Sequence, residues 1–142
     1  MDEPADLLPS TDAHARQHAT VRKAHETELI EDYIELIYEL LDQEGEARAV
    51  DISRRMGVSQ ATVTKMLRRL AERGLITSEP YRSIFLTGAG RAMAEHSRDR
   101  HQVVLRFLRA LGVSDETARI DAEGIEHHVS AETLEQMRRF GE

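Results

Sequence analysis

The sequence predicts a mainly α-helical protein with a small β-hairpin wing: a winged helix-turn-helix followed by an all-helical domain. Three observations lead to this fold class. Apolar residues recur at helical spacing through most of the chain, and a glycine near position 57 separates a short helix from a longer one. Two short apolar–polar runs follow directly, with turn residues between them. The order helix, helix, turn, helix, hairpin is typical of this DNA-binding architecture.

The first helix is predicted over residues 26–43, because leucine, isoleucine and tyrosine side chains repeat there at helical spacing, and Gly45 is placed to end it. A short helix follows over 50–56, and Gly57 makes the turn. The next helix runs over about 60–73, with Ser59 as its N-cap and Gly74 after its end.

The hairpin is predicted from the runs 75–78 and 83–86, which flank Pro80-Tyr81-Arg82. Three more helices follow: residues 88 to about 111, 115 to about 128, and 131 to about 140. We therefore divide the chain into a flexible N-terminal extension (1–25), a winged helix-turn-helix domain (26–87) and a helical domain (88–142). Within the extension, residues from about His18 onward can join the next helix.

Composition excludes several classes of protein. The 142 residues include no cysteine, which excludes disulfides, thiolate metal sites and cysteine nucleophiles. No apolar run approaches the roughly 20 residues of a membrane span, and the first ten residues do not resemble a secretory signal. We therefore expect a cytoplasmic protein with no membrane partner.

Charge is distributed unevenly along the chain. The net charge is −7, yet residues 48–112 carry thirteen basic and five acidic residues. Residues 26–47 carry nine acidic residues and no basic one, and residues 113–142 carry eight acidic and three basic residues. The basic middle can face phosphate, and the acidic flanks can bind cations.

The helix over 60–73 has two distinct faces. Its apolar stripe is Val63, Met66, Leu67 and Leu70. Its outer face holds short polar side chains that can reach base edges and basic ones that can reach phosphates. The predicted DNA-binding residues are Ser59, Gln60, Thr62, Thr64, Lys65, Arg68 and, at the hairpin tip, Arg82. The alternative is a solvated amphipathic helix whose basic residues serve solubility.

Acidic and histidine side chains form a second pattern. Glu123, Glu126 and His127 fall within one arc of a predicted helix, from which His128 points away. Asp32 and Glu35 lie one turn apart on the first helix and can supply the other half of a metal site, with His101 as a further contributor. The alternative is that Glu28, Asp32, Glu35 and Glu39 form only a solvated acidic stripe.

The charges of this set favour two divalent cations, because four carboxylates with a total charge of −4 would otherwise repel one another. Oxygen and imidazole donors without sulfur suit Mn²⁺ or Fe²⁺ and disfavour structural zinc.

Several stretches together resemble the diphtheria-toxin-repressor (DtxR) family of metal-dependent transcriptional regulators, over about residues 28–140. They are Asp32-Tyr33-Ile34-Glu35, residues 58–66, Tyr81-Arg82, Arg100-His101, and residues 121–128. The resemblance implies a homodimer in which the helical domain mediates dimerisation. The metal ligands it implies are Asp32, Glu35, His101, Glu123, Glu126 and His127.

The resemblance is to the manganese-responsive branch of the family. Iron-responsive relatives resemble this layout but have Met at the position of Asp32 and Cys at that of Glu123, and their ancillary ligands are replaced here by Leu105 and Arg119. The predicted function is manganese-dependent repression of manganese homeostasis genes through binding to double-stranded operator DNA. No enzymatic activity and no organic substrate are expected. A winged-helix repressor that responds to an organic ligand is the alternative, and a two-metal hydrolase is less favoured.

Overall fold

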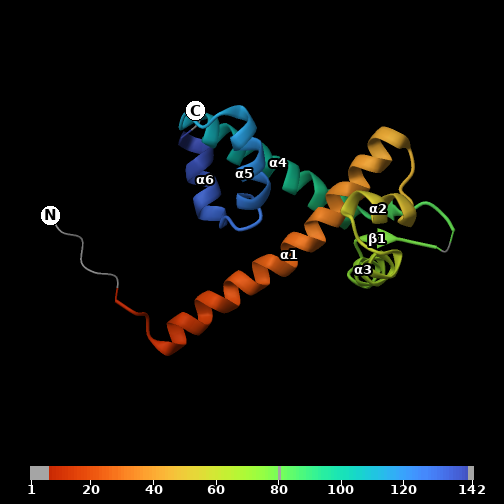
Figure 1. Cartoon of the computed structure of the whole chain (residues 1–142), viewed down its shortest axis with the longest axis horizontal. Coiled ribbons are helices and arrows are strands. Elements are labelled where there is room, and N and C mark those ends of the chain that lie inside the picture. Colours follow the sequence, from red (N-terminus) through yellow and green to blue (C-terminus); the bar gives the residue numbers. More distant parts are fainter. Residues whose placement is uncertain (1–6, 80, 141–142) are drawn as a thin grey trace.

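The computed structural model describes residues 7–79 and 81–140, and within them the chain forms a mainly helical fold with one antiparallel hairpin (Figure 1). The predicted fold class is confirmed. The elements are α1 (Thr11–Glu44), α2 (Ala49–Met56), α3 (Gln60–Glu72), β1 (Ile76–Thr77), β2 (Phe85–Leu86), α4 (Gly88–Ala110), α5 (Asp115–Ile125) and α6 (Ala131–Phe140).

Helix α1 begins earlier than the apolar pattern predicts. It starts at Thr11 rather than near His18, and the Ser10 hydroxyl accepts a hydrogen bond from the Ala13 amide at 3.2 Å as its N-cap. The first buried residue of the helix is Ile30, so its N-terminal half packs against little else and shows no apolar periodicity. That absence of a buried face explains why periodicity alone could not detect this part of the helix. Residues 1–6 of the predicted extension lie outside the described residues.

The N-terminal core is built on the second half of α1. Ile34 and Ile37 are fully buried together with Ile52 of α2 and with Val63 and Leu70 of α3. The hairpin pairs Ile76 with Leu86 and Thr77 with Phe85. The Ile84 amide donates to the Ala47 carbonyl at 2.7 Å, which ties the hairpin to the α1–α2 loop. The position of α3 and of the hairpin therefore depends on α1.

Helix α4 connects two hydrophobic cores. Its start packs closely against Leu75, the residue just before β1, because a Cβ on Gly90 would lie 2.0 Å from the Leu75 carbonyl oxygen. Ala94 belongs to the N-terminal core, whereas Val104 and Leu108 belong to a second core with α5 and α6. Figure 1 shows α5 and α6 at one end of α4, and α2, α3 and the hairpin at the other. No helix within the described part of the chain is long and apolar enough to cross a membrane.

Candidate functional site

Carboxylates and imidazoles from three elements meet where α1 passes α4 and the end of α5. They form three overlapping groups, in each of which one donor atom per residue lies within 4.8 Å of the others. The groups are His101, Glu123 and Glu126; Glu35, Glu126 and His127; and Glu28, Asp32 and His127. The structure thus brings together all six residues named as candidate ligands and adds Glu28.

Glu126 lies at the centre of this cluster. Its side chain is 1% exposed, and its two oxygens face different histidines. Oε2 lies 2.7 Å from His101 Nδ1, and Oε1 lies 3.4 Å from His127 Nε2. Glu123 is more exposed, and its Oε1 lies 3.6 Å from His101 Nδ1. A cavity of about 150 Å³, lined in part by Glu35, His101, Glu123 and Glu126, connects this side of the cluster to solvent.

The local backbone at the end of α5 differs from the prediction. The helix ends at Ile125 instead of about residue 128, so Glu126 and His127 belong to the turn that follows it. Glu126 keeps helical backbone angles, and its amide still donates to the Ala122 carbonyl, so its side chain stays near that of Glu123. His128, predicted to point away from the cluster, lies with Nε2 2.9 Å from Glu28 Oε2.

Glu31 belongs to the site although the sequence pattern did not predict it. Its side chain is buried, and its Oε2 lies 2.6 Å from His127 Nδ1 and also accepts a hydrogen bond from Arg100. Burial raises the pKa of Glu31, but His127 and Arg100 outweigh that effect and lower it below its ordinary value. The only sequence signal is that Glu31 lies beside Ile30 on the margin of the buried face of α1.

Burial and mutual repulsion perturb the other carboxylates. Burial, with Glu126 as the main charged neighbour, raises the pKa of Glu35 to about 7. Burial, with Glu123 as the main neighbour, raises the pKa of Glu126 to about 8. Burial lowers the pKa of His127, but the carboxylates of Asp32 and Glu31 reverse this and raise it to about 10. Such a cluster holds protons when nothing else neutralises its charge.

Two buried polar atoms of the cluster make no hydrogen bond within the described residues: Glu35 Oε1 and His127 Nε2. Asp32 Oδ1 lies 3.2 Å from His127 Nε2, but the two atoms do not form a hydrogen bond. Unpaired buried donors and acceptors are costly, and here both belong to groups that ligate metals when deprotonated. The donor set of carboxylates and imidazoles without sulfur fits a divalent cation such as Mn²⁺.

The second predicted surface lies on α3 and the hairpin. All seven predicted DNA-binding residues are exposed: Ser59, Gln60, Thr62, Thr64, Lys65, Arg68 and Arg82. An open groove of about 630 Å³ between α3 and the hairpin is lined by Gln60, Thr64, Arg68 and Arg82, among other residues. The Ser59 hydroxyl accepts from the Thr62 amide at 3.1 Å, so this side chain caps α3 as well as facing outward.

The hairpin tip presents Tyr81 and Arg82. Tyr81 has a left-handed backbone (φ 64°) and is 98% exposed. Arg82 lies 3.2 Å from Glu79 in an exposed ion pair, which leaves its guanidinium accessible. The tip therefore has the form of a wing that can reach a neighbouring polyanion.

Comparison with known proteins places these features in a family. Residues 25–84 match the family model described as the iron-dependent repressor N-terminal DNA-binding domain. Residues 87–142 match the iron-dependent repressor metal-binding and dimerisation domain. The two matches meet near the hairpin and together cover most of the chain.

Close relatives include the transcriptional regulator MntR of Escherichia coli O6:H1, which is 55% identical over 133 residues, 94% of this chain and 86% of that protein. MntR of Salmonella typhimurium is 53% identical over 133 residues, 94% of this chain and 85% of that protein.

Among solved structures, a manganese-dependent transcriptional repressor in complex with manganese superposes with a TM-score of 0.69 at 28% identity. That alignment covers 79% of this chain and 52% of the other, so the chain spans about half the length of that repressor. Two matched domains in the family's order, and relatives above 50% identity along nearly the whole chain, agree with the geometry. This chain belongs to the iron-dependent repressor (DtxR) family of metal-dependent transcriptional regulators.

Proposed function

We propose that the protein is a manganese-dependent transcriptional repressor that binds operator DNA as a homodimer and controls manganese homeostasis genes. One observation carries this proposal: candidate ligands from α1 converge with candidate ligands from α4 and the end of α5. Helix α1 supports the winged helix-turn-helix domain, whereas the other ligands belong to the helical domain. The MntR relatives support the assignment to manganese.

The residues that would hold the metal are Asp32, Glu35, His101, Glu123, Glu126 and His127. Their carboxylates carry a total charge of −4, which matches two divalent cations per subunit with both histidines neutral. When bound, the cations supply positive charge that offsets repulsion among these carboxylates. Mn²⁺ is the proposed ion, and Fe²⁺ or other divalent cations can occupy the same donors.

Coupling between the metal-binding cluster and the DNA-binding face of α3 follows from the packing of α1. Asp32 and Glu35 alternate along this helix with Ile34 and Ile37, which pack in the core that supports α3. A change in the position of α1 relative to α4 therefore moves the recognition helix. Without metal, Glu35 and Glu126 hold protons or repel each other, and no ion joins α1 to the helical domain. The two domains are then less ordered, and DNA binding must restore that order. Metal and operator are then expected to strengthen each other's binding reciprocally.

On DNA, the short polar residues at the start of α3 (Gln60, Thr62 and Thr64, with Ser59 as cap) would face base edges in the major groove. Lys65 and Arg68 would contact phosphates, and Arg82 would reach the backbone or minor groove from the wing. In a dimer, two α3 helices must be held about one DNA turn apart. The proposal includes a cytoplasmic location and no catalytic step.

The test is fluorescence anisotropy of metal-stripped protein on labelled promoter DNA from a manganese importer gene of the same genome. Mn²⁺ is titrated at fixed ionic strength, with scrambled DNA as control, because salt alone changes such affinities. Tight, sequence-specific binding that requires Mn²⁺ is expected. Equal binding with and without metal contradicts the proposal and favours a winged-helix repressor that responds to an organic ligand.

A further inference from the structure

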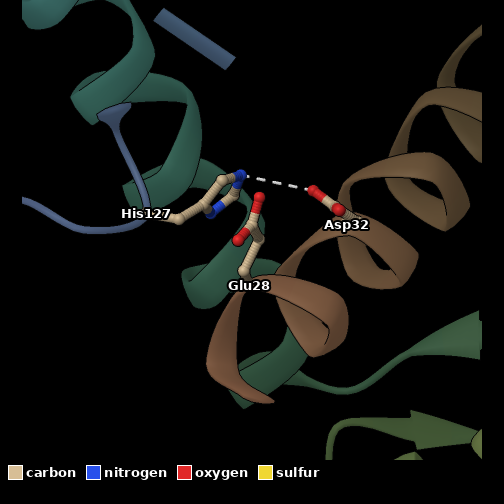
Figure 2. A group of neighbouring side chains, drawn as sticks. All are labelled: Glu28, Asp32 and His127. Atoms are coloured by element: carbon tan, nitrogen blue, oxygen red, sulfur yellow. Dashed lines mark ion pairs between the residues drawn. The ribbon is translucent and has the colours of Figure 1, made fainter. Parts of the chain in front are cut away.

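Glu28 lies one helical turn before Asp32 on α1, so both side chains project from the same side of the helix. It belongs with Asp32 and His127 to a group whose donor atoms lie within 4.8 Å of one another. Figure 2 shows the Glu28 carboxylate beside the His127 ring, near the line that joins this ring to Asp32. Glu28 thus extends the cluster of candidate ligands toward the N-terminal part of α1.

A second observation, an unpaired buried nitrogen of His127, indicates that this group can bind a ligand. The His127 side chain is 1% exposed, and its Nε2 makes no hydrogen bond within the described residues, although it faces Asp32 at 3.2 Å. The other ring nitrogen, Nδ1, is engaged by Glu31 at 2.6 Å. The geometry therefore leaves one buried nitrogen available for a ligand on the side where Glu28 and Asp32 lie.

One contact holds Glu28 in this position, and a second holds its partner His128. His128 Nε2 lies 2.9 Å from Glu28 Oε2, and the His128 ring also meets the ring of His25 edge-on at a centroid distance of 5.1 Å. Helix α1 begins seventeen residues before Glu28, at Thr11, so Glu28 is well inside the helix and away from its fraying end. Because α1 begins this early, regular helix on both sides of Glu28 fixes the direction of its side chain. In a shorter helix, Glu28 would lie at the N-terminus.

We propose that Glu28 is an additional metal ligand of this chain. Its carboxylate would bind the same ion as Asp32 and His127, and His128 positions the Glu28 side chain. This inference rests on the proposed metal binding. A further carboxylate oxygen makes this position richer in hard donors, which favours Mn²⁺ over ions that prefer nitrogen or sulfur.

The experiment measures Mn²⁺ uptake by metal-stripped protein, using the electron paramagnetic resonance signal of free aqueous Mn²⁺ to count bound ions. Four proteins are compared with the wild type: Glu28→Gln, Glu28→Asp, His128→Gln and Glu26→Gln. Glu26 is exposed on the same helix two residues away, so its variant makes the same charge change without touching the cluster. Thermal unfolding of each metal-free variant shows whether the fold is intact.

The wild type is expected to bind two Mn²⁺ per subunit. Glu28→Gln should weaken the binding of one of these two ions by about tenfold or more. Loss of a residue that only supports a metal ligand typically weakens binding about 10–100-fold. Glu28→Asp keeps the charge but shortens the reach, so it should also weaken that ion. His128→Gln should cause a smaller loss, and Glu26→Gln should cause none.

Three results would overturn the inference, and they differ in what they mean for the proposed function. If the wild type binds Mn²⁺ and Glu28→Gln binds as tightly as Glu26→Gln, Glu28 is only a partner of His128 on the surface, and the proposed function stands. Wild-type affinity in Glu28→Asp together with a loss in Glu28→Gln likewise shows a distant effect of charge rather than ligation. If the wild type takes up no Mn²⁺, both this inference and the proposed function fail.

Discussion

His127 Nδ1 lies 2.6 Å from Oε2 of the buried Glu31, on a helix ninety-six residues away in sequence. This contact fixes the orientation of the imidazole and leaves Nε2 facing Asp32 and Glu126. Arg100 forms an ion pair with the same carboxylate and so balances its charge in a largely buried environment. A glutamate that is not among the candidate ligands thus sets the direction in which one of them points.

Replacing Glu31 with Gln should therefore impair the site indirectly. The amide keeps the shape but loses the charge that pairs with Arg100 and orients His127. We expect Mn²⁺ affinity to fall about 10–100-fold, the usual effect of losing such a supporting partner. The free energy of unfolding should fall by about 3–5 kcal/mol, because Arg100 is left buried without its counter-charge. Mn²⁺ titration and urea unfolding measure the two effects. Unchanged values of both would show that Glu31 has no positioning role.

Glu126→Gln should abolish the stimulation of DNA binding by Mn²⁺, because this carboxylate lies between His101 and His127 and faces both of them. Binding to operator DNA is measured by anisotropy with and without Mn²⁺. Glu116→Gln, on the exposed first turn of α5, serves as the control and should respond as the wild type does. A normal metal response in Glu126→Gln would refute the assignment of this residue as a ligand.

Arg82→Ala should weaken binding to most DNA sequences alike, because an exposed guanidinium at the wing is placed for phosphate. The slope of log affinity against log salt concentration should become shallower by about 1. Competition among operator variants and a salt titration test this prediction. A sharp change in base preference would instead assign Arg82 to base recognition.

The stability of the metal-free protein should fall as the pH rises from about 5 to 8. The pKa values of Glu35 (about 7) and Glu126 (about 8) are raised, so the folded state holds protons that the unfolded state has already lost. A raised pKa stabilises the fold fully below the ordinary carboxyl value and loses that effect as the pH passes the folded value. The pKa of His127, about 10, extends the trend above pH 8.

Mn²⁺ takes the place of these protons, so the rise in Tm that Mn²⁺ causes should be larger at pH 8 than at pH 6. Differential scanning fluorimetry at both pH values, with and without Mn²⁺, measures the effect. In Glu126→Gln, which cannot titrate at that position, the metal-free Tm should depend less on pH. A metal-free Tm that rises over this range would contradict the assigned protonation.

Local pattern in the sequence determined the fold class and most of the elements. Glycines at 45 and 57 take left-handed backbone where the helices end, and Ser59 and Thr87 cap α3 and α4 as expected. Spacing and residue type suggested the six candidate ligands that the structure gathers, because carboxylates one turn apart share a helix face whatever packs against it, and the family resemblance implied them as one set. The early part of α1 was not predicted, since a helix without a buried face leaves no periodic signal.

Only the tertiary structure decided which acidic residues of α1 have partners and which face water. Glu28, Asp32, Glu35 and Glu39 form one acidic stripe in the sequence. Folding leaves Glu39 exposed and brings the first three to the end of α5, almost a hundred residues away. It also buries Glu31 between Arg100 and His127. A buried charge persists only where other parts of the chain supply its counter-charge and hydrogen bonds, and that pairing depends on packing between distant segments rather than on local sequence.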